Sequence, residues 1–357
     1  MFKTVLYKLA YSLLVMWGVA SLVFCLFSIL PGDPSSMMLG QMDNEEMRLA
    51  IQKKYGFDQP LQKQYLYYLN DLSPLSFHSK NENDFTNVNN HKYSVWTSTS
   101  FSEFDILIKT PYLRESFVRK GTSVTTIIAD TLPNTFVLAF AAMFIALALG
   151  ISLGVYSAVH QYKFIDQFLS SVSVLGMALP SFFSAIIIAW LFGFVWQQYT
   201  GLSMTGSLFE VDDYGNGEYI VWKNLILPAL TLGIRPLAVV MQLTRNSILD
   251  TLSEDFIRTA KAKGLSSRRI LFVHALPNAL NPVVTAASGW LASMLAGAVF
   301  VEYIFGWNGL GKEIVYALNY LDLPLVMGAV LTLSICFVII TIITDIIYYC
   351  LDPKLWV

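Results

Sequence analysis

Residues 256–277 read FIRTAKAKGLSSRRILFVHALP, a basic segment that lies between two long apolar stretches. Ser253 is a good N-cap for a helix that begins here. Glu254 and Asp255 follow in the first turn, where the helix dipole favours acidic side chains. Gly264 can take the left-handed conformation that ends this helix, and Ser266 or Ser267 can cap the next one. The pattern therefore predicts a short helix, a glycine turn and a second helix.

The segment is too highly charged to lie in lipid. Five of its side chains are basic: Arg258, Lys261, Lys263, Arg268 and Arg269. A short helix held at the membrane surface by flanking spans is well placed to dock on a soluble partner. Positive loops are also ordinary in membrane proteins, where they set the orientation. Residue types alone fit both interpretations.

The composition is that of an integral membrane protein. The chain has 357 residues, of which 55% are hydrophobic and 13% are charged, whereas a soluble domain has about 25% charged residues. A net charge of −2 argues against nucleic acid as a partner. Cys25, Cys336 and Cys350 all fall in apolar segments, where each is most simply a small buried hydrophobe.

An apolar run of about 20 residues crosses the hydrocarbon core as a helix. Six segments qualify, so we expect an all-α integral membrane protein with these spans: Leu9–Leu30, Leu132–Val159, Phe168–Tyr199, Leu225–Leu249, Ala279–Val301 and Pro324–Tyr349. The first is interpreted as a retained helix, because its apolar stretch is long for a signal peptide. Pro180 is expected to kink the third span. Arg235 and Arg245 make the fourth the least certain.

Lysines and arginines in the short loops set the orientation. They place both termini and the loop 250–277 in the cytoplasm. Residues 1–30 are then the first region, and residues 132–357 are expected to form a five-helix core. Residues 31–131 are then a large extracytoplasmic loop. Arg119 and Lys120 lie in this loop, although basic residues usually gather on the cytoplasmic side. Long loops translocate largely regardless of charge.

The extracytoplasmic loop is predicted to contain two helices and an insert. Asn44 can cap a helix that runs to Tyr55 and is ended by Gly56, and Pro60 stands at the start of a second helix. Residues of about 76–110 are rich in polar side chains with aromatic rings interspersed. We expect this insert to be ordered but irregular.

Catalytic and metal-binding patterns are absent from the sequence. The four histidines lie outside the spans, and neither metal-ligand spacing nor a phosphate-binding loop occurs. We therefore expect no catalytic, metal or cofactor site on this chain. The remaining candidates are two charges within spans, because such charges are costly. Arg235 and Asp345 are interpreted as lining a substrate pathway, or else as structural groups, with Arg235 held by carbonyls beside Pro236.

The basic segment resembles a known motif. Residues 257–264 read IRTAKAKG, and Leu276-Pro277 follow. They resemble the loop of ABC importer permeases that has a Glu-Ala-Ala-type motif, then glycine, then an apolar-x-Leu-Pro element. Arg258, Thr259 and Ala260 stand at the first positions, and the Arg-Thr-Ala form resembles the dipeptide, oligopeptide and nickel branch. His274 replaces the usual apolar residue.

Further matches to this branch lie along the chain in the expected order: residues 31–34, 131–135, 227–232, 243–245, 302–311, 322–325 and 351–354. Two features depart from the pattern. The insert at about 76–110 is longer than the usual connection. Asn308 stands where proline is expected, which predicts a looser turn.

The resemblance implies a permease subunit of an ABC importer in the cytoplasmic (inner) membrane. It would pair with a second homologous permease, two ATP-binding-cassette ATPases and an extracytoplasmic substrate-binding protein, and it would carry di- or oligopeptides. Arg258, Thr259, Ala260, Lys261, Lys263, Gly264, Leu276 and Pro277 would form the ATPase-coupling loop. ATP and Mg would bind the ATPases, so this chain is a transport subunit rather than an enzyme.

Other functions fit the residues less well. Nickel chelates or small glycosides are alternative substrates within the same branch. A secondary transporter or channel without an ATPase would be expected to show inverted repeats or several intramembrane acids, and Asp345 alone is poor support. A membrane enzyme would need a catalytic constellation that the sequence lacks.

Overall fold

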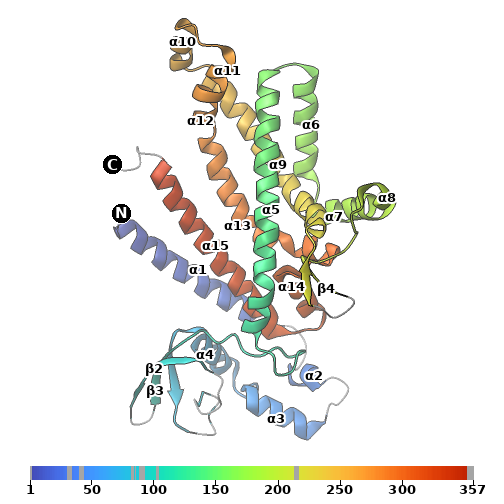
Figure 1. The fold of residues 1–357 in the computed structure, drawn as a ribbon. Helices are drawn as coiled ribbons and strands as arrows, with labels where there is room; N and C mark the ends of the chain where they lie inside the picture. Colours follow the sequence, from blue (N-terminus) through green and yellow to red (C-terminus); the bar gives the residue numbers. More distant parts are fainter. Residues whose placement is uncertain are drawn as a thin grey trace. The chain divides into compact units, whose positions relative to one another are not determined.

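A computed structural model describes residues 2–29, 34–39, 44–81, 84, 86–87, 93–101, 104–212 and 217–351 (Figure 1). Five helices in this part of the chain are long and apolar enough to cross a membrane, or six if one bent pair counts as a span. The five are α1 (Phe2–Ile29), α5 (Val124–Val159), α9 (Lys223–Leu252), α13 (Asn281–Phe305) and α15 (Leu323–Leu351). The expected helical membrane fold is confirmed.

The third expected span is a broken helix. Helices α6 (Phe164–Ala178) and α7 (Ser181–Trp190) meet at an angle of 108°. Pro180 causes the break, because proline lacks a backbone N–H and disfavours helical geometry in the preceding residue, and Leu179 is extended. The proline therefore does more than kink this segment. A π-turn (Leu191–Val195) and the short α8 (Gln197–Thr200) follow.

Helix α9 is continuous despite its two internal prolines, Pro228 and Pro236. It packs closely against α5 at Gly150 and Gly154. A Cβ atom added to Gly154 would lie 2.6 Å from the Cβ of Thr244 and 2.7 Å from the backbone oxygen of Met241. Small residues at this spacing allow two membrane helices to approach backbone to backbone.

The chain divides into two compact units, residues 1–130 with 316–335 and residues 131–315 with 336–357. The first unit contains α1, α2 (Pro34–Leu39), α3 (Glu45–Tyr55) and α4 (Leu61–Leu72). The predicted caps of α3 are confirmed, since the Asn44 side chain accepts from the Glu46 N–H and Gly56 is left-handed with φ 71°. Pro60 immediately precedes α4.

The insert is more regular than the sequence predicts. Strands β1 (Leu75–Ser79), β2 (Val95–Ser100) and β3 (Phe104–Lys109) form an antiparallel sheet in the order β1-β3-β2. The expectation of an irregular insert is wrong because the usual alternation is inverted here. In β1 the polar Ser76 and His78 are buried, while Leu75 and Phe77 are exposed. These buried groups are satisfied by hydrogen bonds, because Ser76 Oγ bonds to His78 Nε2 at 2.8 Å and His78 Nδ1 donates to the Thr86 backbone oxygen at 2.7 Å.

A second buried polar network joins the sheet to α4. The Asp71 carboxylate accepts hydrogen bonds from Arg114 Nε at 2.9 Å and from the Tyr93 hydroxyl at 3.0 Å. The Asp71 backbone oxygen accepts from Lys109 Nζ at 2.6 Å. Lys109 is only 1% exposed, and this burial lowers the pKa of its ammonium group to about 8. These contacts fasten β3 to the end of α4.

Candidate functional site

The predicted helix–glycine–helix segment is present between α9 and α13. Helix α10 (Asp255–Ala262) is followed by α11 (Ser267–Arg269), a π-turn (Ile270–Ala275) and α12 (Leu276–Ala279). Figure 1 shows α10 and α11 beyond the end of α12. We refer to residues 255–277, the part of the expected loop 250–277 that begins with α10, as the coupling loop.

The start of the coupling loop differs from the prediction. Helix α9 continues to Leu252, so Ser253 closes that helix, and its hydroxyl donates to the Asp250 backbone oxygen at 2.6 Å. Glu254 takes the N-cap position of α10, and its side chain makes no capping bond within the described residues. Ser253 as the N-cap is therefore wrong. Ser266 does occupy the N-cap position of α11, but also without a side-chain capping bond to any described residue.

Gly264 ends α10 as predicted. Its φ is 75°, its N–H donates to Lys261 O at 3.0 Å, and the Leu265 N–H donates to Ala260 O at 3.3 Å. These two bonds form a Schellman motif. No described atom lies within 4 Å of the position that a Cβ on Gly264 would take. Glycine is therefore required here by its backbone angle and not by lack of space.

A small hydrophobic core makes the coupling loop rigid. Ile257 and Ala260 from α10 are buried against Ile270 and Ala275, and Leu265 packs on the same cluster. Among the expected coupling residues, Leu276 packs with a second cluster at the ends of α5 and α9, and Pro277 begins α12. The Thr259 hydroxyl donates to the Asp255 backbone oxygen at 3.1 Å.

The outer face of the coupling loop is cationic and partly apolar. The exposed basic side chains are Arg258, Lys261, Lys263, Arg268 and Arg269. Phe256 and Phe272 are 45% and 56% exposed among them. Arg258 pairs with Asp255 at 3.1 Å, but both side chains are largely exposed. The loop therefore presents a fixed positive surface with aromatic groups.

Arg235 lies in a small pocket between α7, α9 and α13. Its guanidinium carbon is 5.9 Å from the centre of the Trp290 ring. The pocket holds ≈ 60 Å³ and is also lined by the hydroxyl residues Ser181, Thr231 and Ser293. Within the described residues, the Arg235 side chain has no ion pair or hydrogen bond. Asp345 lies on α15 and does not line this pocket.

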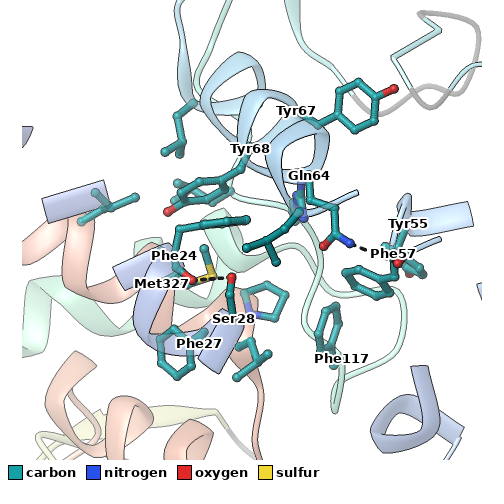
Figure 2. A pocket seen from close by; sticks show the side chains of 18 residues that line it. Phe24, Phe27, Ser28, Tyr55, Phe57, Gln64, Tyr67, Tyr68, Phe117 and Met327 are labelled. Atoms are coloured by element: carbon teal, nitrogen blue, oxygen red, sulfur yellow. Dashed lines mark hydrogen bonds between the residues drawn. The ribbon is translucent and has the colours of Figure 1, made fainter. Parts of the chain in front are cut away.

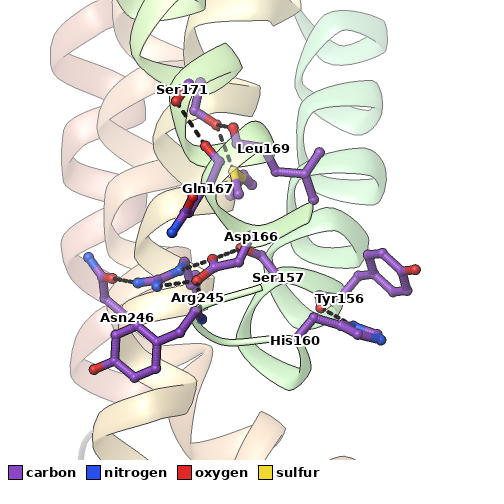
Figure 3. A network of polar contacts seen from close by, with 12 residues as sticks. Tyr156, Ser157, His160, Asp166, Gln167, Leu169, Ser171, Arg245 and Asn246 are labelled. Atoms are coloured by element: carbon purple, nitrogen blue, oxygen red, sulfur yellow. Dashed lines mark hydrogen bonds and ion pairs between the residues drawn. The ribbon is translucent and has the colours of Figure 1, made fainter. Parts of the chain in front are cut away.

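Sequence reasoning missed a polar network that fastens α9 to the start of α6 (Figure 3). The Asp166 carboxylate accepts from Arg245 Nε at 2.6 Å and from Arg245 Nη2 at 2.8 Å, which is the bidentate geometry of a strong pair. It also accepts from the Ser157 hydroxyl at 2.5 Å and the Tyr162 N–H at 2.9 Å. Asp166 is 2% exposed. Arg245, which made the fourth span uncertain, is thus neutralised inside the protein.

A second missed group is Glu302, which is fully buried near the end of α13. Its Oε2 accepts from the Gly311 N–H at 2.7 Å and the Lys312 N–H at 3.2 Å, at the start of α14 (Leu310–Asn319). A Cβ on Gly309 would lie 2.4 Å from the same oxygen. A Cβ on Gly311 would lie 2.8 Å from it, so Gly309 and Gly311 are both needed to fit this carboxylate.

Two matched motifs form one joint in the structure. The Trp307 ring N–H donates to Asn134 O at 3.0 Å, and Asn134 Nδ2 donates to Asn308 O at 2.8 Å. Thr135 Oγ1 accepts from the Leu310 N–H at 2.8 Å. Asn308 takes part through its backbone oxygen, so these bonds hold the turn without proline. Of the other matches, residues 31–33 and 352–354 lie outside the described residues.

Comparison with known proteins identifies the relatives of this chain. The family described as "Binding-protein-dependent transport system inner membrane component" matches residues 150–357, and its N-terminal counterpart matches residues 1–85. The chain is 30% identical over 346 residues to the oligopeptide transport system permease protein AppB of Bacillus subtilis, covering 96% of each. It is 31% identical over 360 residues to the probable D,D-dipeptide transport system permease protein DdpB of Escherichia coli, covering 96% of this chain and 94% of that one.

A solved structure shares the fold. The inward-facing MetNI methionine ABC transporter aligns with a TM-score of 0.50 at 18% identity, covering 64% of this chain and 98% of that one. At this identity the likeness concerns the fold alone.

Proposed function

Because the chain belongs to the family of binding-protein-dependent transport system inner membrane components, we propose that it forms half of a peptide-import pathway driven by ATPases that dock on the coupling loop. The rigid, exposed and cationic surface of residues 255–277 carries this proposal. A second homologous permease would supply the other half. A substrate-binding protein would deliver peptide on the opposite side.

The coupling loop has the properties that a docking element needs. Its core and its Schellman motif fix the backbone before a partner arrives, so little ordering entropy is lost on binding. Its basic side chains suit an acidic cleft, and exposed Phe256 and Phe272 suit an apolar floor. An ATP-binding subunit with such a cleft is the partner that we propose.

Helix α9 links the coupling loop to the pocket at Arg235. From Arg235 to Leu252 the helix is unbroken, and 17 residues span about 25 Å. The Asp166–Arg245 pair and the close approach at Gly154 hold α9 against α6 and α5. Movement of the docked loop would therefore shift the pocket as part of a rigid body.

Peptide is the substrate favoured by the names of the relatives and by the chemistry of this pocket. Every peptide in its ordinary form carries a terminal carboxylate, and Arg235 is a cation with no described anionic partner. The centre of the Trp290 ring lies 5.9 Å from the guanidinium carbon, and the hydroxyls of Ser181 and Ser293 are available for further hydrogen bonds. We propose that Arg235 holds the substrate carboxylate during passage. The position of Asp345 outside this pocket makes Arg235 the first of the two pathway candidates to test.

Changing Arg235 to glutamine is expected to reduce uptake of a labelled peptide about tenfold or more, because a charged hydrogen bond contributes about 1.5–3 kcal/mol. Arg235→Lys should restore transport only in part, since lysine lacks the planar fork. Lys223→Gln, which removes an exposed charge from the start of the same helix, is the matched control. Uptake is measured in cells with permease levels checked by immunoblot. Full uptake by Arg235→Gln, or its loss from the membrane, would reject the pathway role.

We also propose that both termini and the coupling loop face the cytoplasm and that β1–β3 face the outside. Ser98 on β2 and Ser267 on α11 are both exposed, so each is a suitable position for a cysteine probe. In a background without native cysteines, an impermeant maleimide should label Ser98→Cys in spheroplasts. It should label Ser267→Cys only after permeabilisation. Labelling of Ser267→Cys in intact spheroplasts would reject this orientation, because it would place the coupling loop outside.

A further inference from the structure

An aromatic pocket of ≈ 240 Å³ lies within the first unit, whereas the coupling loop and Arg235 belong to the second. Its walls come from the end of α1, from α3 and α4, from residues 113–117 and from the first turns of α15. Figure 2 shows Ser28 between Phe24 and Phe27 on one side and Phe57 and Phe117 on the other. The pocket is larger than the roughly 150 Å³ apolar cavity that holds a benzene molecule.

The main polar groups that line this pocket are bonded to the protein. Gln64 Nε2 donates to the backbone oxygens of Phe57 at 3.1 Å and Gln59 at 2.8 Å. The Ser28 hydroxyl donates to Phe24 O at 2.7 Å, and Arg114 pairs with Asp71. The Tyr68 ring also lines the pocket, but its hydroxyl is fully buried, so a ligand in the pocket does not reach it. A fitting ligand is therefore mainly hydrocarbon.

The position of the pocket points to the source of such a ligand. Phe24, Phe27 and Ser28 lie in the last turns of the apolar span of α1, and Leu323 and Met327 lie in the first turns of α15. Two membrane helices thus reach the same pocket at their ends. Aromatic side chains gather there, as they do at membrane–water interfaces.

We propose that this pocket binds one acyl chain of a membrane phospholipid. The bilayer is in contact with both helix ends and supplies such chains at high local concentration. The chain would fill the space between α1, α4 and α15 and so hold α4 at the membrane surface. This site is independent of substrate and of ATPase docking.

The test uses the permease in its assembled transporter, reconstituted with a phospholipid that carries a diazirine in one acyl chain. After illumination, mass spectrometry should find lipid adducts on the α4 peptide (Leu61–Leu72). Ser28→Trp should reduce these adducts at least fivefold, because the indole fills the pocket while the lost hydroxyl made only a bond within its own helix. Leu26→Trp, on the same helix but outside the pocket lining, is the matched control and should leave the yield unchanged.

The proposal would be overturned if no adducts formed on α4. It would also be overturned if the wild type and Ser28→Trp gave the same adduct yield. Stronger labelling by a free fatty acid with the same diazirine would overturn it as well, because it would show that the ligand is not a phospholipid. If Ser28→Trp fails to assemble, Leu61→Trp serves as the second blocking variant, since Leu61 lines the pocket and is 56% exposed.

Discussion

Replacing Gly264 with valine is expected to leave the permease in the membrane and to abolish its capture of the ATPase. Gly264 has a φ of 75°, which a β-branched residue adopts only with strain of about 1 kcal/mol or more. Relief of that strain would break the bonds from Gly264 and Leu265 and release Leu265 from the loop core. The docking surface would then lose its fixed shape, while every membrane span stays unaltered.

The measurement is co-purification of the ATPase with tagged permease, followed by substrate-stimulated ATP hydrolysis in lipid. Gly264→Asn is the matched control, because asparagine tolerates the left-handed conformation and no described atom obstructs a Cβ there. It should retain most of the captured ATPase. Normal capture and turnover by Gly264→Val would show that the loop is only an orientation signal.

The charges of the same loop can be tested separately. Lys261 and Lys263 are exposed, so changing both to glutamate should not disturb the loop core. If they face an acidic cleft, ATPase capture should fall, and the remaining capture should become less sensitive to salt. An unchanged yield at every salt concentration would mean that these two lysines face solvent or lipid headgroups.

Replacing Asp166 with alanine is expected to destabilise the permease by about 3 kcal/mol, because Arg245 would be left largely buried without its partner. For a chain of 357 residues, with an unfolding entropy of about 2.1 cal/mol/K per residue, that loss lowers the melting temperature by roughly 4 °C. The Ser157 hydroxyl and the Tyr162 N–H would lose an acceptor as well.

The melting temperature is measured on the solubilised permease by the loss of its monodisperse chromatographic peak. The double variant Asp166→Ala with Arg245→Met is the control, since removing both charges avoids the buried unpaired cation. It should recover much of the lost stability. If Asp166→Ala has the same melting temperature as the wild type, the Asp166–Arg245 pair is not needed to hold α6 against α9.

Local signals predicted the parts of the structure that depend on neighbouring residues. The caps at Asn44 and Gly56 and the left-handed Gly264 follow from the chemistry of one residue in its own turn. Pro180 predicted a bend at the right residue, but as a kink and not as a 108° break. The prediction of Ser253 as an N-cap was wrong because the position of a cap depends on where the preceding helix ends. That end is fixed by the packing of α9 and not by the serine itself.

Contacts between distant residues could not be predicted from the sequence. Asp166 and Arg245 are 79 positions apart, and each taken alone looks like an unfavourable charge near a span. Trp307 and Asn134 are 173 positions apart, so their two motifs gave no sign that they form one joint. The sheet in the insert was missed because β1 buries Ser76 and His78 and exposes Leu75 and Phe77, which reverses the usual burial of polar and apolar side chains.

Uptake into proteoliposomes tests the proposed function most directly. The chain is reconstituted with a homologous permease and the ATPases of its own system, and a binding protein loaded with labelled peptide is added outside. We predict accumulation of peptide only with ATP and Mg²⁺ on the ATPase side, and only when this chain is present. Accumulation by this chain alone, driven by an ion gradient without ATPases, would contradict the proposal and identify a secondary transporter.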